Sequence, residues 1–556
     1  MRNKIINKYI IILALVILFQ IMNNIYFLSQ DNLPLLYDNY ERHGQSLSNF
    51  NQFKEGNING LINQFFFFHD SPLISYPSFF HYFLVGTAED VTSFQGTIFL
   101  VILIIATYLL GKELFSRDVG LLGAILISFM PLILAMSKVP YDDIAFTAMF
   151  ILTVYFFLKS KKFSDIKFTW LFNISLGLAL LSKFNSIFFL ATLAFTYLTL
   201  KLIFDRNDLR RFFLNLNRTK IKHFLISFFI SMLLPIIFYF NYSLLIVETI
   251  YSVYDKPALV ISNLLPAIVN YLQTIHLAFE NYSVFIIFII ALIFFFLYDR
   301  KHRLFVFSLL LSANLYHILL LFFFPLTITN IYRLLVFIKP VYIIIISLFF
   351  IDYLCKFLSK AFNKLKLRFL RKTSYALCLT LIILFFSVSF TLYFNYSKAT
   401  PEPTKLNYIF GRYHPIRLNY DVNELIDDMS NGKGNKIVFI FSPPSYFTDI
   451  FNSYARADYD NIEVLNTDFA ESDLKFNDKY NLPVERYNKL ITNNSFQTEN
   501  LEEFDYIILS ENAEKEEFYT YHTQISGYIA SNPGKFSVLK RIITDDKNNA
   551  ITIFKK

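Results

Sequence analysis

The chain has 556 residues, of which 55% are hydrophobic and 19% aromatic, and this composition is far too apolar for a soluble globular protein. Its formal net charge of +8 is compatible with a nucleic-acid partner. A membrane protein also places basic residues on its cytoplasmic loops, so the distribution of these residues decides between the two explanations. Its two cysteines, Cys355 and Cys378, form neither a disulfide framework nor a metal-ligand spacing. The composition predicts an α-helical polytopic membrane protein.

Apolar runs recur along the first 400 residues. The first, YIIILALVILFQIMNNIYFLS, spans about 20 residues, which at about 1.5 Å each crosses a bilayer, and it lacks the small-residue cleavage site of a signal peptide. We expect about eleven transmembrane helices, near residues 9–29, 95–111, 119–137, 143–158, 170–182, 186–203, 224–245, 283–298, 304–324, 333–352 and 374–396. The pair near 170–203 is short, and one re-entrant hairpin in its place would leave the remaining topology unchanged.

The basic residues are distributed unevenly between the two sides of the predicted bundle. With the N-terminus inside, the cytoplasmic segments hold 26 Lys or Arg. The opposite loops hold only Arg42, Lys54, Lys138, Lys183, Lys256, Arg333 and Lys339. The positive-inside rule therefore predicts a cytoplasmic N-terminus, and an odd number of helices puts the last 160 residues outside. No basic stripe is left over for nucleic acid.

Two segments outside the membrane are long enough to form modules. The first external loop, residues 30–94, mixes Phe and Tyr with prolines and polar groups, which is typical of helices in the headgroup layer. From about residue 398 the apolar bias ends, and short β-rich runs (KIVFIF, FDYIILS, FSVLKRIIT and NAITIFKK) alternate with helical patterns. We expect a transmembrane domain over 1–397 and an extracytoplasmic α/β domain over 398–556.

The predicted topology restricts where chemistry can occur. No cytoplasmic segment exceeds about 25 residues, so that side cannot fold into a nucleotide-binding domain, and lipid-borne reactants at the outer membrane edge are expected instead. The external acidic residues closest to the membrane are Asp38, Glu41, Asp70, Asp142 and Asp143. Each of them alone is also compatible with an ordinary helix end, since carboxylates favour helix N-termini.

The order of several motifs over residues 31–350 resembles one family. The matching segments are YDNYER, HDSPLISYP, LLGKELFSRDVGLLGAIL, KVPYDDIAFTAMF, LGLALLSKFNSIFFL and NIYRLLVFIKP. Together they resemble the GT-C glycosyltransferases, in the family of the protein O-mannosyltransferases and the aminoarabinose transferase that acts on lipid A. Asn39 stands where this family often has a second acid. The resemblance implies a membrane enzyme that takes sugar from a polyprenyl-phosphate lipid.

The resemblance also implies roles for particular side chains. Asp38 is the candidate base for the acceptor hydroxyl, and desolvation near hydrocarbon would raise the pKa of its carboxyl and make it a better base. Asp142 or Asp143 would orient the acceptor, or Asp142 would bind a divalent cation together with Asp38. The candidate cations for the leaving phosphate are Arg333 and Lys183, followed by Lys138 and Arg42. Snorkelling at helix ends is the alternative role for these four.

The first loop supplies further candidates for donor or acceptor contacts. These are Glu41, His69, Asp70 and Tyr76, and His69 stands where the family has a basic residue. Interface packing is the alternative role for the loop histidines, whose spacing suits no zinc site.

The expected function is transfer of a sugar to a hydroxyl of a lipid, glycan or protein on the outer face of a plasma or inner membrane. One alternative is a transporter or flippase for lipid-linked saccharides. Against it, the spans carry almost no charge near mid-membrane, and the two halves of the membrane region show no sequence similarity to each other. The other alternative is a polymerase or ligase of the O-antigen type, which would be expected to carry its long external loop late in the membrane region.

Overall fold

The computed structural model describes residues 2–30, 38–67, 72–86, 89–161, 163–183, 186–206, 218–254, 282–299, 301–323 and 336–358 and parts of the last 121 residues. Those parts are 436–441, 462–466, 491–492, 495–496, 501, 504–510, 519–543 and 550–556. The chain divides into two compact units, one including Met1–Ser29 and Gln45–Ala399, the other including Gln30–Gly44 and Pro415–Lys556. The predicted domain boundary near residue 398 stays a prediction.

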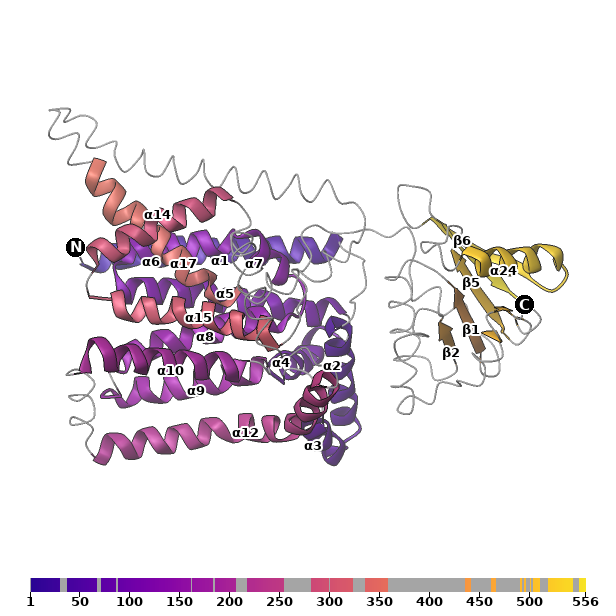
Figure 1. The fold of residues 1–556 in the computed structure, drawn as a ribbon, viewed down its shortest axis with the longest axis horizontal. Helices are drawn as coiled ribbons and strands as arrows, with labels where there is room; N and C mark the ends of the chain where they lie inside the picture. The colour runs from indigo at the N-terminus through magenta and orange to yellow at the C-terminus, as the bar shows by residue number, and fades with distance from the viewer. Residues whose placement is uncertain are drawn as a thin grey trace. The chain divides into compact units, whose positions relative to one another are not determined.

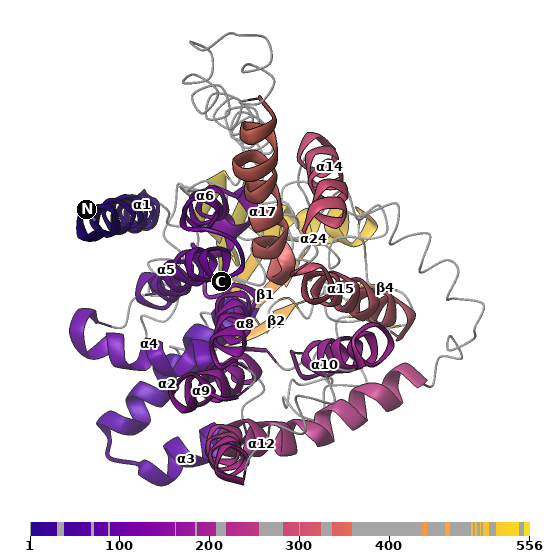
Figure 2. The ribbon, with the colours of Figure 1, turned by 90° about the vertical axis from the view of Figure 1, so that its left-hand side faces the viewer.

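Helices make up the described part of the membrane region. In chain order they are α1 (Arg2–Gln30), α2 (Asp38–Lys54), α3 (Ile58–Phe67), α4 (Pro72–Val85), α5 (Glu89–Leu114), α6 (Arg117–Ser128), α7 (Pro131–Met136), α8 (Asp142–Lys159), α9 (Ile166–Ser182), α10 (Ser186–Phe204), α12 (Arg218–Tyr254), α14 (Tyr282–Tyr298), α15 (Arg303–Phe323), η3 (Val336–Ile338), α17 (Lys339–Leu348) and η4 (Phe349–Leu354). Figure 1 shows the long helices side by side, and Figure 2 views them from their ends. The predicted helical membrane fold is confirmed.

Five stretches in the described residues are long and apolar enough to cross a membrane: Lys8–Gln30, Asp90–Leu114, Ser186–Phe204, Thr219–Phe240 and Val336–Leu358. Ile166–Ser182, Val284–Tyr298 and Arg303–Tyr316 are shorter apolar helices. The two short helices expected near 170–182 and 186–203 are both present, as α9 and α10. The last expected span, 374–396, lies outside the described residues, so the total of eleven stays a prediction.

One expected span is wrong as a single helix. Residues 119–137 form α6, which ends at Ser128, and the six-residue α7, which begins at Pro131. A proline has no backbone N–H to continue the hydrogen-bond ladder, but it fits the first turn of a new helix. The 12 residues of α6 extend only about 18 Å, less than a bilayer core.

The described residues of the C-terminal region form a mixed sheet. Its strands are β1 (Lys436–Phe441), β2 (Ile462–Asn466), β5 (Tyr506–Ser510), β6 (Ser537–Ile543) and β7 (Ala550–Lys555), in the order β2-β1-β5-β7-β6. β1 pairs in parallel with β2 and β5, whereas β7 is antiparallel to β5 and β6. Helix α24 (Tyr519–Ser531) joins β5 to β6, and β3 (Ile491–Thr492) and β4 (Ser495–Phe496) form a separate hairpin. The four β-rich runs noted in the sequence are β1, β5, β6 and β7, and β2 was not expected.

Candidate functional site

The two acidic residues Asp142 and Asp143 form the first turn of α8. Tyr141 precedes them with extended backbone and makes no side-chain cap. Their carboxylates therefore lie where the helix dipole favours negative charge. Both are buried, at 8% and 5% exposure. Buried carboxylates need a partner, so the question is which group compensates their charge.

Neighbouring helices hold the turn that leads into α8. On α1, Asn24 Nδ2 lies 3.0 Å from both Thr97 Oγ1 and Ser137 Oγ, and 3.3 Å from Ser137 O. On α5, Gly96 lies so close to the turn that a Cβ there would be 2.5 Å from Ser137 O and 2.7 Å from Val139 O. Only glycine, which has no Cβ, lets the α5 backbone come this close to the turn. Helices α1 and α5 thus fix where α8 starts and where its acidic pair lies.

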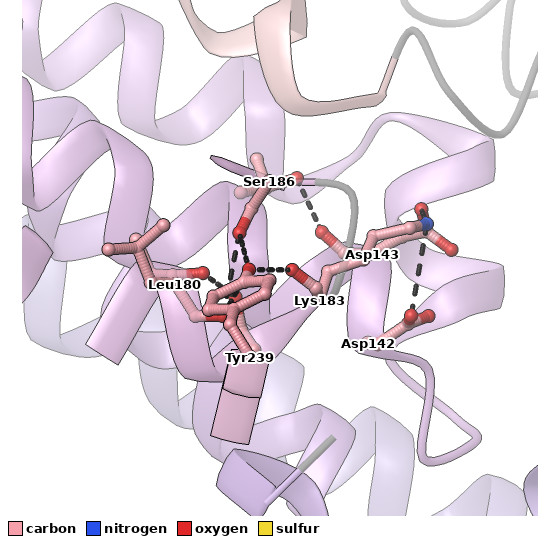
Figure 3. A network of polar contacts seen from close by, with 9 residues as sticks. Asp142, Asp143, Leu180, Lys183, Ser186 and Tyr239 are labelled. Atoms are coloured by element: carbon pink, nitrogen blue, oxygen red, sulfur yellow. Dashed lines mark hydrogen bonds and ion pairs between the residues drawn. The ribbon is translucent and has the colours of Figure 1, made fainter. Parts of the chain in front are cut away.

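The compensating charge comes from Lys183, 40 residues further along the chain. Lys183 follows α9 as its C-cap, in extended conformation. Its Nζ donates to Asp143 Oδ1 and lies 3.8 Å from Asp142 Oδ2, and Lys183 is only 8% exposed (Figure 3). The cation is at a helix C-terminus and the acids are at a helix N-terminus, so both dipoles support the pair. The trio carries two carboxylates and one ammonium.

An aromatic cluster lies next to the acidic pair. Phe146 and Phe150 follow Asp142 by one and two turns of α8, and Phe150 lies 5.0 Å between ring centroids from Phe189 of α10. Phe189 lies 4.2 Å from Phe337 and 5.6 Å from Tyr316, and all five rings are buried. This cluster joins α8, α10, α15 and η3. Buried rings lower the local dielectric, and a low dielectric strengthens a nearby ion pair.

The acidic pair and Lys183 do not fit a divalent cation site. The Lys183 ammonium already occupies the position between the two carboxylates that a cation would take. Across the described parts of the chain, no group of three or more His, Cys, Asp or Glu side chains could hold a metal. The proposed metal ligand Asp38 begins α2, and its side chain lies outside the described residues. A divalent cation held by Asp38 and Asp142 therefore stays a prediction.

The other predicted site residues fall into two groups. Lys138 is buried, and its Nζ lies 4.2 Å from the ring centroid of Phe27, a cation–π contact. Arg42 on α2 is also buried, at 3% exposure. Tyr76 on α4 is half-buried, and its burial raises the pKa of the phenol. Outside the described residues lie Arg333, His69 and Asp70 and the side chains of Asp38 and Glu41. Of the predicted set, the structure brings Asp142, Asp143 and Lys183 together.

Two residues beside Lys183 were not predicted. Tyr239 Oη of α12 lies 3.0 Å from Leu180 O and 3.1 Å from Lys183 O, and Ser186 Oγ lies 3.1 Å from the same phenol oxygen (Figure 3). The chain has 36 tyrosines, so residue type alone did not single this one out.

Solved structures of other proteins share the fold of this chain. The ArnT of Cupriavidus metallidurans, in a crystal structure bound to undecaprenyl phosphate, superposes with a TM-score of 0.55 at 11% identity, over 98% of each chain. Its apo structure gives 0.55 at 12% identity with the same coverage. The Archaeoglobus fulgidus oligosaccharyltransferase in the apo form gives 0.52 at 13% identity, over 90% of this chain and 69% of that one. The chain has the fold of these membrane glycosyltransferases.

A family model adds a sequence match to the site itself. Residues 69–216 match the family described as dolichyl-phosphate-mannose-protein mannosyltransferase. This segment contains Asp142, Asp143 and Lys183. No curated protein sequence matches the chain. Fold and family match together confirm the resemblance to the GT-C glycosyltransferases.

Proposed function

We propose that this protein is a membrane glycosyltransferase that moves a sugar from a polyprenyl-phosphate lipid to an acceptor hydroxyl on the outer face of the membrane. The observation that carries the proposal is the buried trio of Asp142, Asp143 and Lys183 inside the segment that matches the mannosyltransferase family. An ArnT with the same fold has been crystallised with undecaprenyl phosphate, which supports a donor of this chemical class.

In the proposed reaction the acceptor oxygen attacks the anomeric carbon while the bond from that carbon to the phosphate oxygen breaks. The acceptor proton passes to a carboxylate, for which Asp38 is the proposed base. The polyprenyl phosphate leaves with the bonding electrons and gains negative charge. Lys183 offsets part of this charge while Asp143 holds its ammonium in place, and Asp142 orients the acceptor. Arg333, Lys138 and Arg42 are further candidates for phosphate contact, and Glu41, His69, Asp70 and Tyr76 for the donor and acceptor loop.

We also propose that the N-terminus lies in the cytoplasm and the C-terminal α/β domain outside, on the basis of the charge asymmetry of the loops. Contacts at the helix ends agree with the predicted grouping of these ends. Tyr9 donates to Asp118 at 2.7 Å, and Lys159 pairs with Glu113 at 2.8 Å. All four residues belong to segments predicted to be cytoplasmic or next to the cytoplasmic side. The acidic pair with Lys183 joins two helix ends that are predicted to lie outside. We propose a cell or inner membrane of a prokaryote as the location.

A transfer assay tests the proposal. Purified protein in nanodiscs is given radiolabelled undecaprenyl-phosphate sugars and a membrane lipid extract as acceptor pool, and release of free sugar to water gives a readout that needs no known acceptor. We expect wild type to transfer or release label and Asp38→Asn to lose about 100-fold or more of the rate. Full activity of Asp38→Asn would refute the base assignment. In sealed vesicles, movement of intact donor across the bilayer without transfer would favour a flippase.

A further inference from the structure

The C-terminal end of α9 is held by a side chain from another helix. The last carbonyls of a helix have no partner within it. Here Leu180 O and Lys183 O accept from the Tyr239 phenol at 3.0 and 3.1 Å. The phenol has one proton, so it serves the two carbonyls alternately or in a three-centre bond. The backbone N–H of Ser186 also donates to Lys183 O at 3.1 Å.

Close packing of α9 against α12 brings Tyr239 to this position. Asn173 Nδ2 donates to Ser227 Oγ at 2.6 Å, which pins the two helices two turns before the site. One turn further, a Cβ at Gly177 would meet the Ser231 carbonyl, so the two backbones touch. Small residues allow such an approach between membrane helices.

A proline explains why the Ser231 carbonyl faces α9. Pro235 lies inside α12, four residues after Ser231, and has no N–H to bond that carbonyl. The Ser231 carbonyl therefore faces the Gly177 backbone. At interfaces between helices, such a carbonyl commonly accepts a weak Cα–H···O hydrogen bond. One turn beyond the proline, Tyr239 reaches the end of α9.

We propose that Tyr239, supported by Ser186, is a positioning residue that fixes the backbone of Lys183 and so directs its ammonium between Asp142 and Asp143. The assignment rests on the proposed function of this trio. Tyr239 bonds the carbonyl of Lys183 and does not touch the carboxylates through any contact in the described residues. We therefore expect its effect on sugar transfer to pass through the end of α9, where it holds the Lys183 backbone.

Tyr239→Phe tests this, because it removes one hydroxyl and keeps the ring. We expect kcat for transfer to fall about fivefold, which is the usual effect of one hydrogen bond, with Ser186→Ala in the same direction. In a Lys183→Met background the same change should lower kcat less than twofold, since the residue through which it acts is gone. The matched control is Tyr298→Phe on α14, whose tyrosine is 66% exposed and which should leave kcat unchanged.

A second readout is independent of activity. Labelling of intact protein with an amine-reactive reagent, followed by peptide mass spectrometry, measures how accessible Lys183 Nζ is. We expect its labelling rate to rise about fivefold in Tyr239→Phe, with labelling of Lys201 unchanged as internal control. Unchanged Lys183 labelling, or a loss of kcat that adds fully to that of Lys183→Met, would overturn the positioning role. Failure of wild type to transfer sugar, with raised labelling in the variant, would instead overturn the proposed function alone.

Discussion

Replacing Lys183 with methionine removes the cation from two buried carboxylates and keeps a side chain of similar length. The Nζ lies 3.8 Å from Asp142 Oδ2 and closer to Asp143 Oδ1, to which it donates. At an effective dielectric constant of about 20, two charges at this separation interact by about 4 kcal/mol. Breaking a buried pair by removing one partner costs about 3 to 5 kcal/mol, so we expect Lys183→Met to lower the free energy of unfolding by about that amount.

The assay is unfolding of the purified, detergent-solubilised protein by SDS. The helical signal in far-UV circular dichroism measures how much protein is folded. The control is Lys201→Met, which breaks a 2.8 Å pair to an Asp205 side chain that is 42% exposed and should cost less than about 0.5 kcal/mol. The double variant Lys183→Met with Asp143→Asn should be more stable than Lys183→Met alone, because one uncompensated charge is gone. Equal stability of Lys183→Met and Lys201→Met would refute the buried ion pair.

Gly96→Ala should cut transfer activity at least tenfold, because its Cβ would lie 2.5 Å from Ser137 O and displace the turn before the acidic pair, whereas Gly527→Ala, with open space around it, should not. Burial lowers the pKa of His43 to about 4, so between pH 6.5 and 4 only the unfolded chain binds this proton. Thermal stability should thus fall with decreasing pH in that range, by up to about 3 kcal/mol, and His43→Gln should flatten the profile. Lys183→Met should gain Mn²⁺ affinity, measured by paramagnetic resonance, since the cation position between the carboxylates is vacated; no gain over wild type would contradict this.

Much of the helical framework was predictable because apolar length and charge asymmetry are properties of local sequence. Nine of the eleven expected spans coincide with described helical segments, and 374–396 lies outside the described residues. The error at 119–137 arose because an apolar run hides the break before Pro131. The four β-rich runs were recognisable by their β-branched and aromatic residues. β2, with the sequence IEVLN, was missed because Glu463 divides its apolar residues, whereas the equally short β5 opens with the unbroken apolar run YIIL.

The site was predictable in its residues but not in its contacts. Asp142 and Asp143 stood out as external acids before a helix, and Lys183 as one of few external cations. Their pairing depends on how α8 packs against α9, which sequence alone does not give. Lys183 was expected to meet donor phosphate, and the structure pairs it with Asp143. Tyr239 was missed because its role comes from a glycine contact between two helices.

The central claim is that the buried acidic pair orients the acceptor and holds Lys183 against the leaving phosphate during sugar transfer from a lipid donor. The most direct test is the single-turnover rate of label transfer or release from a radiolabelled undecaprenyl-phosphate sugar in nanodiscs, for wild type and Asp143→Asn. The substitution keeps the size of the side chain and removes the charge that holds Lys183. We predict that Asp143→Asn loses at least about 100-fold in rate while donor still binds. An Asp143→Asn protein that transfers sugar at the wild-type rate would contradict the account.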